Sequence, residues 1–211
     1  MARRTHFTLV AAAIGLMAVL PVRVRTEAPP AAEPVPFVTR HPELRAALDR
    51  IARGSASWRA ALTTLVATGR RVVVLTPDQV VVHDTATGVA TPFDRSTVAE
   101  VSPVADRSGN VSSVLVVVNV ERMQALHDRR GSLPGEFHAD LDRVLAHEVY
   151  GHAVPYLEAG HLSGRCADPE PGQPATQSCA IQRENVVRAE LRLGRRTDAA
   201  LGGLILAGML R

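Results

Sequence analysis

Residues 139–159 have the pattern of one amphipathic helix whose apolar stripe ends on ionisable side chains. Three apolar residues recur at helical spacing: Leu141, Val144 and Leu145. The same stripe then reaches Glu148, and His147 directly precedes it. Because an uncompensated carboxylate or imidazole is costly to bury, a helix of this kind needs a partner for both groups. A bound cation would serve as that partner, so the run predicts a metal site.

The second histidine of this run, His152, lies five positions after His147. In a regular α-helix this spacing separates the two side chains by about 140° around the axis, too far for both to reach one ion. One π-type turn, with a hydrogen bond between residues i and i+5, brings them to the same side. Pro155 favours such a turn, because it has no N–H for the carbonyl of Gly151, which is then free to accept from Tyr156. We therefore expect a π-type irregularity in this helix.

The hexapeptide HEVYGH, residues 147–152, resembles the HELLGH motif of the dipeptidyl peptidase III family. Members of that family are zinc peptidases in which the two histidines bind zinc and the Glu between them is the catalytic base. Their third ligand is a Glu from a later helix. The resemblance covers six residues and implies that His147 and His152 bind zinc, with Glu148 as the general base on a zincin-like active-site helix.

A later helix, ending near Gly194, also carries a carboxylate on its apolar stripe. Three residues define that stripe: Ile181, Val187 and Leu191. Glu184 lies on it, whereas Glu190, six positions further on, points about 120° away. By the same cost of burial, Glu184 should face a positive partner. We expect Glu184 to be the third metal ligand.

The third metal ligand could also come from another residue, and Glu184 could have another partner. Three further residues are alternatives as the third ligand: His161, Glu190 and Glu158. Glu184 can also form an ion pair with Arg188, four positions later, which needs no metal and is compatible with ligation. The sequence Glu-Asn-Val-Val-Arg at residues 184–188 resembles the E-N-x-x-R element that follows the zinc helix in short bacterial effector-type metallopeptidases.

These residues predict the chemistry of an exported zinc-dependent hydrolase, with a peptide or protein as its substrate. Three protein ligands leave zinc a fourth position for a water molecule, whose proton Glu148 would take and pass to the leaving amine. The developing oxyanion needs a further donor. Four residues could supply it: Tyr150, Tyr156, His161 and Arg188. Of these we expect Tyr156 and Arg188 to be catalytic. The alternatives are a hydrolase of another bond, such as an amide in cell-wall peptide, and a non-catalytic exported domain with a structural metal or an ion-paired remnant of the site.

The N-terminal segment is typical of an export signal. Arg3 and Arg4 precede an apolar run from Phe7 to Leu20, which suits a signal peptide better than a membrane span. We expect a signal peptide or signal anchor at 1–26, a Pro- and Ala-rich linker at 27–38 and one metallopeptidase domain at 39–211. The protein would then be secreted or periplasmic in a bacterium, and would meet the membrane only through a possible N-terminal anchor.

The remaining pattern predicts an α+β fold, with a small antiparallel sheet packed against helices. Two helices are expected between residues 42 and 65, with Trp58 as a core residue of the second. The period changes to that of strands between Arg70 and Glu121, and within the expected strand from Val111 to Val120 the residues from Val114 to Val118 are apolar on both faces, as in a central strand. A final apolar run within 197–210 is too short to span a bilayer and should pack as a closing helix.

Charge and cysteine content narrow the partners and the compartment. All 24 residues counted as Lys or Arg are arginines, the net charge is +3, and no basic cluster is interleaved with aromatic residues. We therefore expect no nucleic acid partner. The two cysteines, Cys166 and Cys179, favour a disulfide bond in an exported protein, with thiolate ligation of the metal as the alternative.

Overall fold

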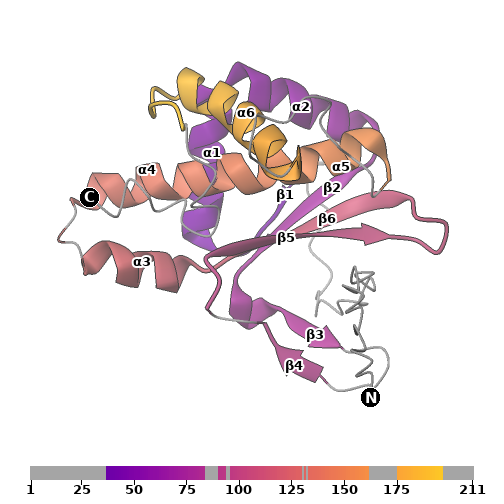
Figure 1. Cartoon of the computed structure of the whole chain (residues 1–211), viewed down its shortest axis with the longest axis horizontal. Helices are drawn as coiled ribbons and strands as arrows, with labels where there is room; N and C mark the ends of the chain where they lie inside the picture. The colour runs from indigo at the N-terminus through magenta and orange to yellow at the C-terminus, as the bar shows by residue number, and fades with distance from the viewer. Residues whose placement is uncertain are drawn as a thin grey trace, which may run out of the picture.

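The structure, a computed structural model, describes residues 37–83, 90–93, 96–129, 131, 133–161 and 175–196. Helices cover one face of a four-stranded sheet, and a two-stranded hairpin lies beyond the other face (Figure 1). The strands are β1 (Phe37–Val38), β2 (Arg71–Leu75), β3 (Val81–His83), β4 (Ala90–Pro92), β5 (Ala99–Ala105) and β6 (Val111–Val118). The helices are α1 (Pro42–Gly54), α2 (Ala56–Ala67), α3 (Val120–Asp128), α4 (Pro134–Leu145), α5 (Val154–Ala159) and α6 (Ala175–Glu190), with a 3-10 turn η1 (Pro77–Gln79) and a π-helix η2 (Ala146–Ala153).

The main sheet has the strand order β1-β2-β6-β5 and is mixed. β1 and β6 both pair with β2 in parallel, whereas β5 and β6 form an antiparallel hairpin. The predicted α+β class is confirmed, and so is the central position of β6. The prediction that the sheet is antiparallel is wrong, because β6 turns back from β5 and inserts beside β2 in the same direction as β2.

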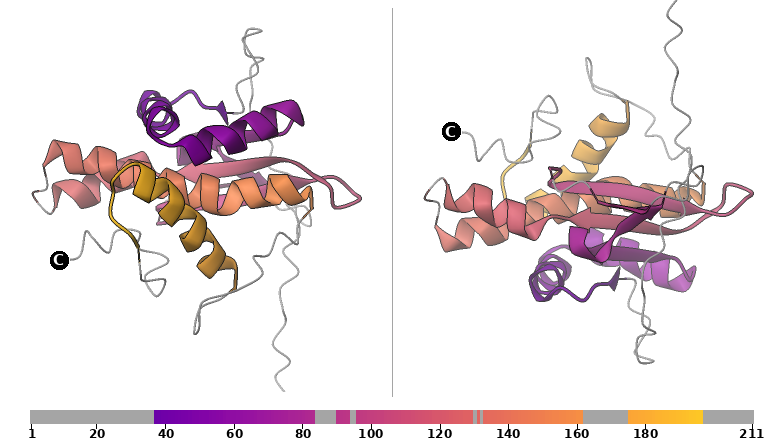
Figure 2. Two further views of the ribbon diagram at one scale, coloured as in Figure 1. Left: turned by 90° about the horizontal axis from the view of Figure 1, so that it is seen from above. Right: turned by 90° about the horizontal axis from the view of Figure 1, so that it is seen from below.

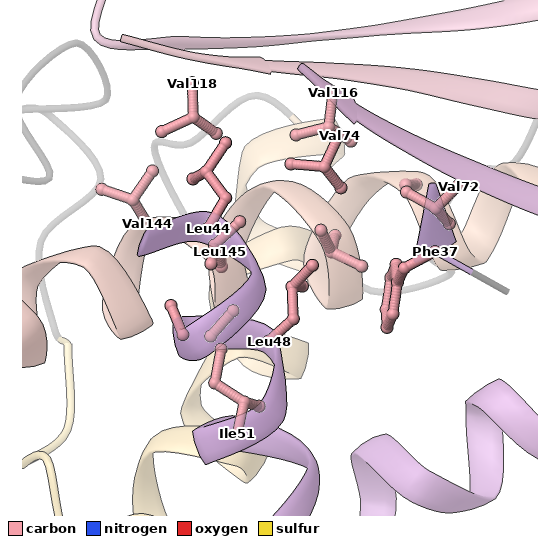
Figure 3. Packing of buried hydrophobic residues seen from close by; sticks show 14 of the residues in the cluster. Phe37, Leu44, Leu48, Ile51, Val72, Val74, Val116, Val118, Val144 and Leu145 are labelled. Atoms are coloured by element: carbon pink, nitrogen blue, oxygen red, sulfur yellow. The ribbon is translucent and has the colours of Figure 1, made fainter. Parts of the chain in front are cut away.

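The alternation of side chains along β6 divides the apolar interior between the two faces of the sheet. Val114, Val116 and Val118 lie in the main core. Figure 3 shows Val116 and Val118 pointing toward residues of α1 and α4. Leu115 and Val117 lie in a smaller cluster on the opposite face. Burial on both faces explains why residues 114–118 are apolar at every position.

An aromatic stack ties the start of the described chain to this core. Trp58 on α2 is completely buried, and its ring stacks on Phe37 with the centroids 5.6 Å apart and on Tyr150 with the centroids 6.3 Å apart. The expected core role of Trp58 is confirmed. The predicted linker extends to residue 38, but Phe37 and Val38 form β1, because Phe37 buries its ring against Trp58 and β1 pairs with β2.

One nearly continuous helical run, made of α4, η2 and α5, lies against the sheet, and α6 crosses it (Figure 2). The crossing is close at η2, where Gly151 faces Ala180 of α6. A Cβ atom at position 151 would lie 2.8 Å from the carbonyl oxygen of Ala180. Gly151 therefore allows α6 to approach η2 closely.

Several predicted features lie outside the described residues. These are the signal segment 1–26, Cys166 as the partner expected for Cys179, and the final apolar run. The disulfide bond stays a prediction. Within the described part of the chain, no helix is both long enough and apolar enough to cross a membrane.

Candidate metal site

The candidate site is built on the π-helix η2, which contains the whole HEVYGH hexapeptide. The amide of Val154 donates to the carbonyl of Val149, five residues earlier, instead of to the carbonyl four residues earlier. The π-type irregularity expected from the spacing of the two histidines is thus confirmed. The hydrogen bond from Val154 to Val149 lies two residues before the expected one from Tyr156 to Gly151.

The π-helix brings the rings of His147 and His152 together. Their Nε2 atoms are 3.2 Å apart, and the ring planes meet edge to face at 89°. Two nitrogens bound tetrahedrally to one zinc ion at about 2.0–2.1 Å lie about 3.3 Å from each other. The separation of the two imidazole nitrogens therefore fits one zinc ion.

Glu184 of α6 contacts the other nitrogen of the same ring. Its Oε2 atom lies 2.9 Å from Nδ1 of His147, and the Glu184 side chain is completely buried. The structure thus brings Glu184 to His147 but not to the gap between the two Nε2 atoms. In this arrangement Glu184 is a carboxylate that orients the ring of His147, and it does not lie beside both rings as the expected third ligand would.

This contact decides which nitrogen of His147 carries a proton. The carboxylate of Glu184 can only accept, so Nδ1 of His147 donates to it and Nε2 keeps its lone pair. The Nε2 atom of His152, 3.2 Å away, then donates to that lone pair. Burial, together with the neighbouring His147, lowers the pKa of His152 to about 4, so this ring is neutral at pH 7. His152 is therefore in the neutral form that a metal ligand requires.

Two arginines hold the carboxylate of Glu184 in place. Arg188 donates to Oε1 at 2.7 Å, and Arg196 donates to Oε2 at 3.1 Å. Burial raises the pKa of Glu184, but the hydrogen bonds from His147 and Arg188 and the charge of Arg196 outweigh it, and the net shift is downward. The Glu184–Arg188 ion pair considered from the sequence is present, so Arg188 is engaged with Glu184.

Arg196 is a site residue that the sequence analysis missed. Its backbone N–H donates to Oδ1 of Asn185 at 2.7 Å, and Nδ2 of Asn185 donates to its carbonyl at 2.8 Å. Arg188 also donates to the carbonyl of Gly194 at 2.7 Å. The Glu, Asn and Arg of the E-N-x-x-R element therefore have linked roles: Glu184 contacts His147, and the other two hold the segment that delivers Arg196. The expected burial of the Glu184 carboxylate was the feature of the sequence that indicated a need for positive partners, of which Arg196 is the second.

Glu148, the predicted general base, is buried on η2 with 8% of its surface exposed. Burial raises the pKa of its carboxyl, and the charges of Glu184 and Glu100 act in the same direction, against the lowering effect of His147. A carboxyl whose pKa lies above the usual range is suited to accepting and returning a proton near neutral pH.

Strand β5 borders the site on the sheet side. It is the last strand in the sheet order, packs against η2 and carries Glu100. Its outer edge has no strand neighbour among the described residues. Pro103 lies in β5, where an edge position tolerates its missing N–H. An edge strand of this kind has backbone groups that can pair with an extended peptide.

The other candidate residues have partners elsewhere. Glu190 accepts hydrogen bonds from Ser55 and Ser57 at the start of α2. Glu158 pairs with Arg183 at 3.1 Å. Exposed His161 forms an isolated β-bridge with Asn110, and Tyr156 is half-buried against the main core. Among the residues that the structure describes, no group of three or more His, Cys, Asp or Glu side chains forms a metal cage.

No family model, no curated protein and no solved structure matches this chain. Its function therefore has to be argued from the two converging imidazoles, Glu148 and the charges around Glu184.

Proposed function

We propose that this protein is an exported hydrolase that binds one divalent ion, zinc by its donor set, and cleaves a peptide bond. The observation that carries the proposal is the 3.2 Å separation of the two Nε2 atoms, produced by a π-helix. A π-helix is rare, and π-type bulges within α-helices are frequently found at functional sites. Here it brings together the two imidazoles that an α-helix would separate.

In this proposal each side chain has one task. His147 and His152 hold the ion through Nε2, and Glu184 accepts from Nδ1 of His147, which fixes the ring and makes Nε2 a stronger ligand. When bound, zinc lowers the pKa of a coordinated water and polarises the carbonyl to be attacked. Glu148 takes a proton from the water and returns it to the leaving amine. Arg188 and Arg196 neutralise Glu184.

The substrate class follows from strand β5. A peptide in extended conformation can add to the outer edge of β5 through backbone hydrogen bonds, which places its chain next to η2. Glu148 lies on the same helix. We therefore propose a peptide as the substrate rather than a small amide, together with secretion or periplasmic location through the N-terminal signal segment.

A second candidate function is a non-catalytic domain with an ion-paired remnant of a metal site. The observation that favours it is the charge around Glu184, whose carboxylate pairs with Arg188 and Arg196 at 2.7 and 3.1 Å and is neutralised by them. In that case the cluster of His147, Glu184 and the two arginines serves the fold.

Metal content and hydrolysis separate the two candidates. The zinc content of the purified full chain is measured by mass spectrometry. Its activity is assayed on a mixture of peptides, with the cleavage products also detected by mass spectrometry. The hydrolase should contain about one zinc ion per chain, and Glu148→Gln should keep the zinc while losing about a hundredfold or more of the rate. A zinc-free, inactive wild type that is as stable as Glu148→Gln would support the ion-paired remnant instead.

A further inference from the structure

The π-helix leaves one backbone carbonyl without its helical partner. In an α-helix the amide of Val154 would donate to the carbonyl of Tyr150. Here it donates to the carbonyl of Val149 instead. Continuing the π register, the next donor would be the amide of residue 155, and Pro155 has none. The carbonyl of Tyr150 must therefore find a donor outside the helix.

Arg183 of α6 supplies that donor. Its Nε atom donates to the carbonyl of Tyr150 at 2.9 Å. The same guanidinium lies over the ring of Tyr150, with Cζ 4.7 Å from the ring centroid, and pairs with Glu158 on α5 at 3.1 Å. One side chain thus contacts both the π-helix η2 and the helix α5. A planar guanidinium can make these contacts together, because its donors form a rigid fork and its face stacks on an aromatic ring.

We propose that Arg183 is a positioning residue for the candidate metal site. By binding the carbonyl of Tyr150, it stabilises the π register of η2, and that register places His152 beside His147. In an α register the carbonyl of Tyr150 would receive the amide of Val154, and the two histidines would again point about 140° apart. The inference rests on the proposed function only for its effect on metal binding. Its effect on the ring geometry is independent of any metal.

The test uses a substitution that removes the donor and a second one that replaces it. Arg183→Met removes the hydrogen bond to Tyr150. Arg183→Lys keeps a charged donor that can bind the same carbonyl. Arg50→Met is the matched control, since Arg50 of α1 also joins two helices through an ion pair, with Asp142 at 2.7 Å, but its partners Asp142 and the carbonyl of His138 lie on α4.

Two readouts are measured on the full chain. In the metal-free protein, NMR detects the proximity of the His147 and His152 rings, whose centroids are 4.8 Å apart, by a nuclear Overhauser effect. Zinc affinity is then measured by competition with a chromophoric chelator. Arg183→Met should lose the ring contact and bind zinc about tenfold more weakly or worse. Arg183→Lys should keep most of both, because its ammonium group can still donate to the carbonyl of Tyr150.

Several results would overturn the proposal. One is an Arg183→Met protein that keeps the ring contact and the wild-type zinc affinity, and loses only stability to urea, as Arg50→Met should. Another is an Arg183→Lys protein that is no better than Arg183→Met in ring contact and zinc affinity. If wild-type protein binds no zinc, the proposed function fails, but the ring contact in the metal-free variants still decides the role of Arg183.

Discussion

The Nδ1 atom of His147 lies 2.9 Å from Oε2 of Glu184, while Nε2 of the same ring faces His152. Glu184 therefore acts on the site through His147. Glu184→Gln should weaken zinc binding by about 10- to 100-fold with an unchanged stoichiometry, because a neutral amide accepts from Nδ1 less strongly than a carboxylate. Chelator competition gives the affinity, and mass spectrometry gives the zinc content at saturation.

The matched control for this change is Glu190→Gln, on the same helix. Glu190 bonds with Ser55 and Ser57, so its loss should leave zinc affinity unchanged. If Glu184→Gln abolishes zinc binding altogether, Glu184 is a direct ligand of the ion, as the sequence first indicated. If it changes nothing, the contact with His147 has no part in metal binding.

Acid should destabilise the metal-free protein through His152. Its pKa is about 4 in the folded state, against the ordinary value of 6.5, because burial and the nearby His147 disfavour its charged form. The unfolded chain therefore binds a proton first as the pH falls, and stability is lost between about pH 6.5 and pH 4. At about 1.4 kcal/mol per pKa unit, this contribution is roughly 3 kcal/mol.

Urea unfolding at pH 7 and pH 4.5, with a chelator present, measures this loss. His152→Gln should remove most of the difference between the two pH values, since glutamine does not titrate. The same substitution at His138, which is exposed on α4, is the control and should leave the difference in place. An equal pH dependence in wild type and His152→Gln would contradict the assignment.

Trp58 offers a test of the aromatic stack. Its Nε1–H is buried without a hydrogen-bond partner in the part of the chain that the structure describes. Trp58→Phe removes this unpaired donor and keeps a ring between Phe37 and Tyr150, so the cost of the smaller volume is partly offset. We expect a loss of about 1 kcal/mol in the free energy of unfolding, against about 3–5 kcal/mol for Trp58→Ala. Equal losses for the two variants would show that the ring contacts do not contribute.

The sequence predicted the geometry of η2 because the constraint there is local. Two histidines five positions apart reach one ion only if the helix is widened, and Pro155 removes an amide nearby. Glu184 was likewise found from its place on an apolar stripe. Its actual contact was not predictable in this way, because the choice between the two nitrogens of His147 depends on Arg188 and on Arg196, which lies beyond the end of α6.

Strand pairing was predicted less well for a similar reason. The apolar run in β6 correctly indicated a central strand, but its partners come from distant parts of the chain. A strand apolar on both faces is typical of a parallel neighbour, and that neighbour is β2. The β3–β4 and β5–β6 pairs are antiparallel, and the wrong part of the prediction concerns β2, which pairs in parallel with both β1 and β6.

Gly151 lies where η2 and α6 approach each other closely, and we expect a larger residue there to push the two helices apart. In Gly151→Ala the new Cβ atom would lie 2.8 Å from the backbone oxygen of Ala180 and 3.0 Å from its Cα atom, so α6 must move away from η2. We expect a loss of about 1–3 kcal/mol in the free energy of unfolding and weaker zinc binding, because α6 carries Glu184. Gly54→Ala is the control: its Cβ atom would meet only the end of the Leu191 side chain, which can rotate away. Urea unfolding should show little change for Gly54→Ala, and equal losses at the two positions would mean that the close approach of α6 to η2 is not required.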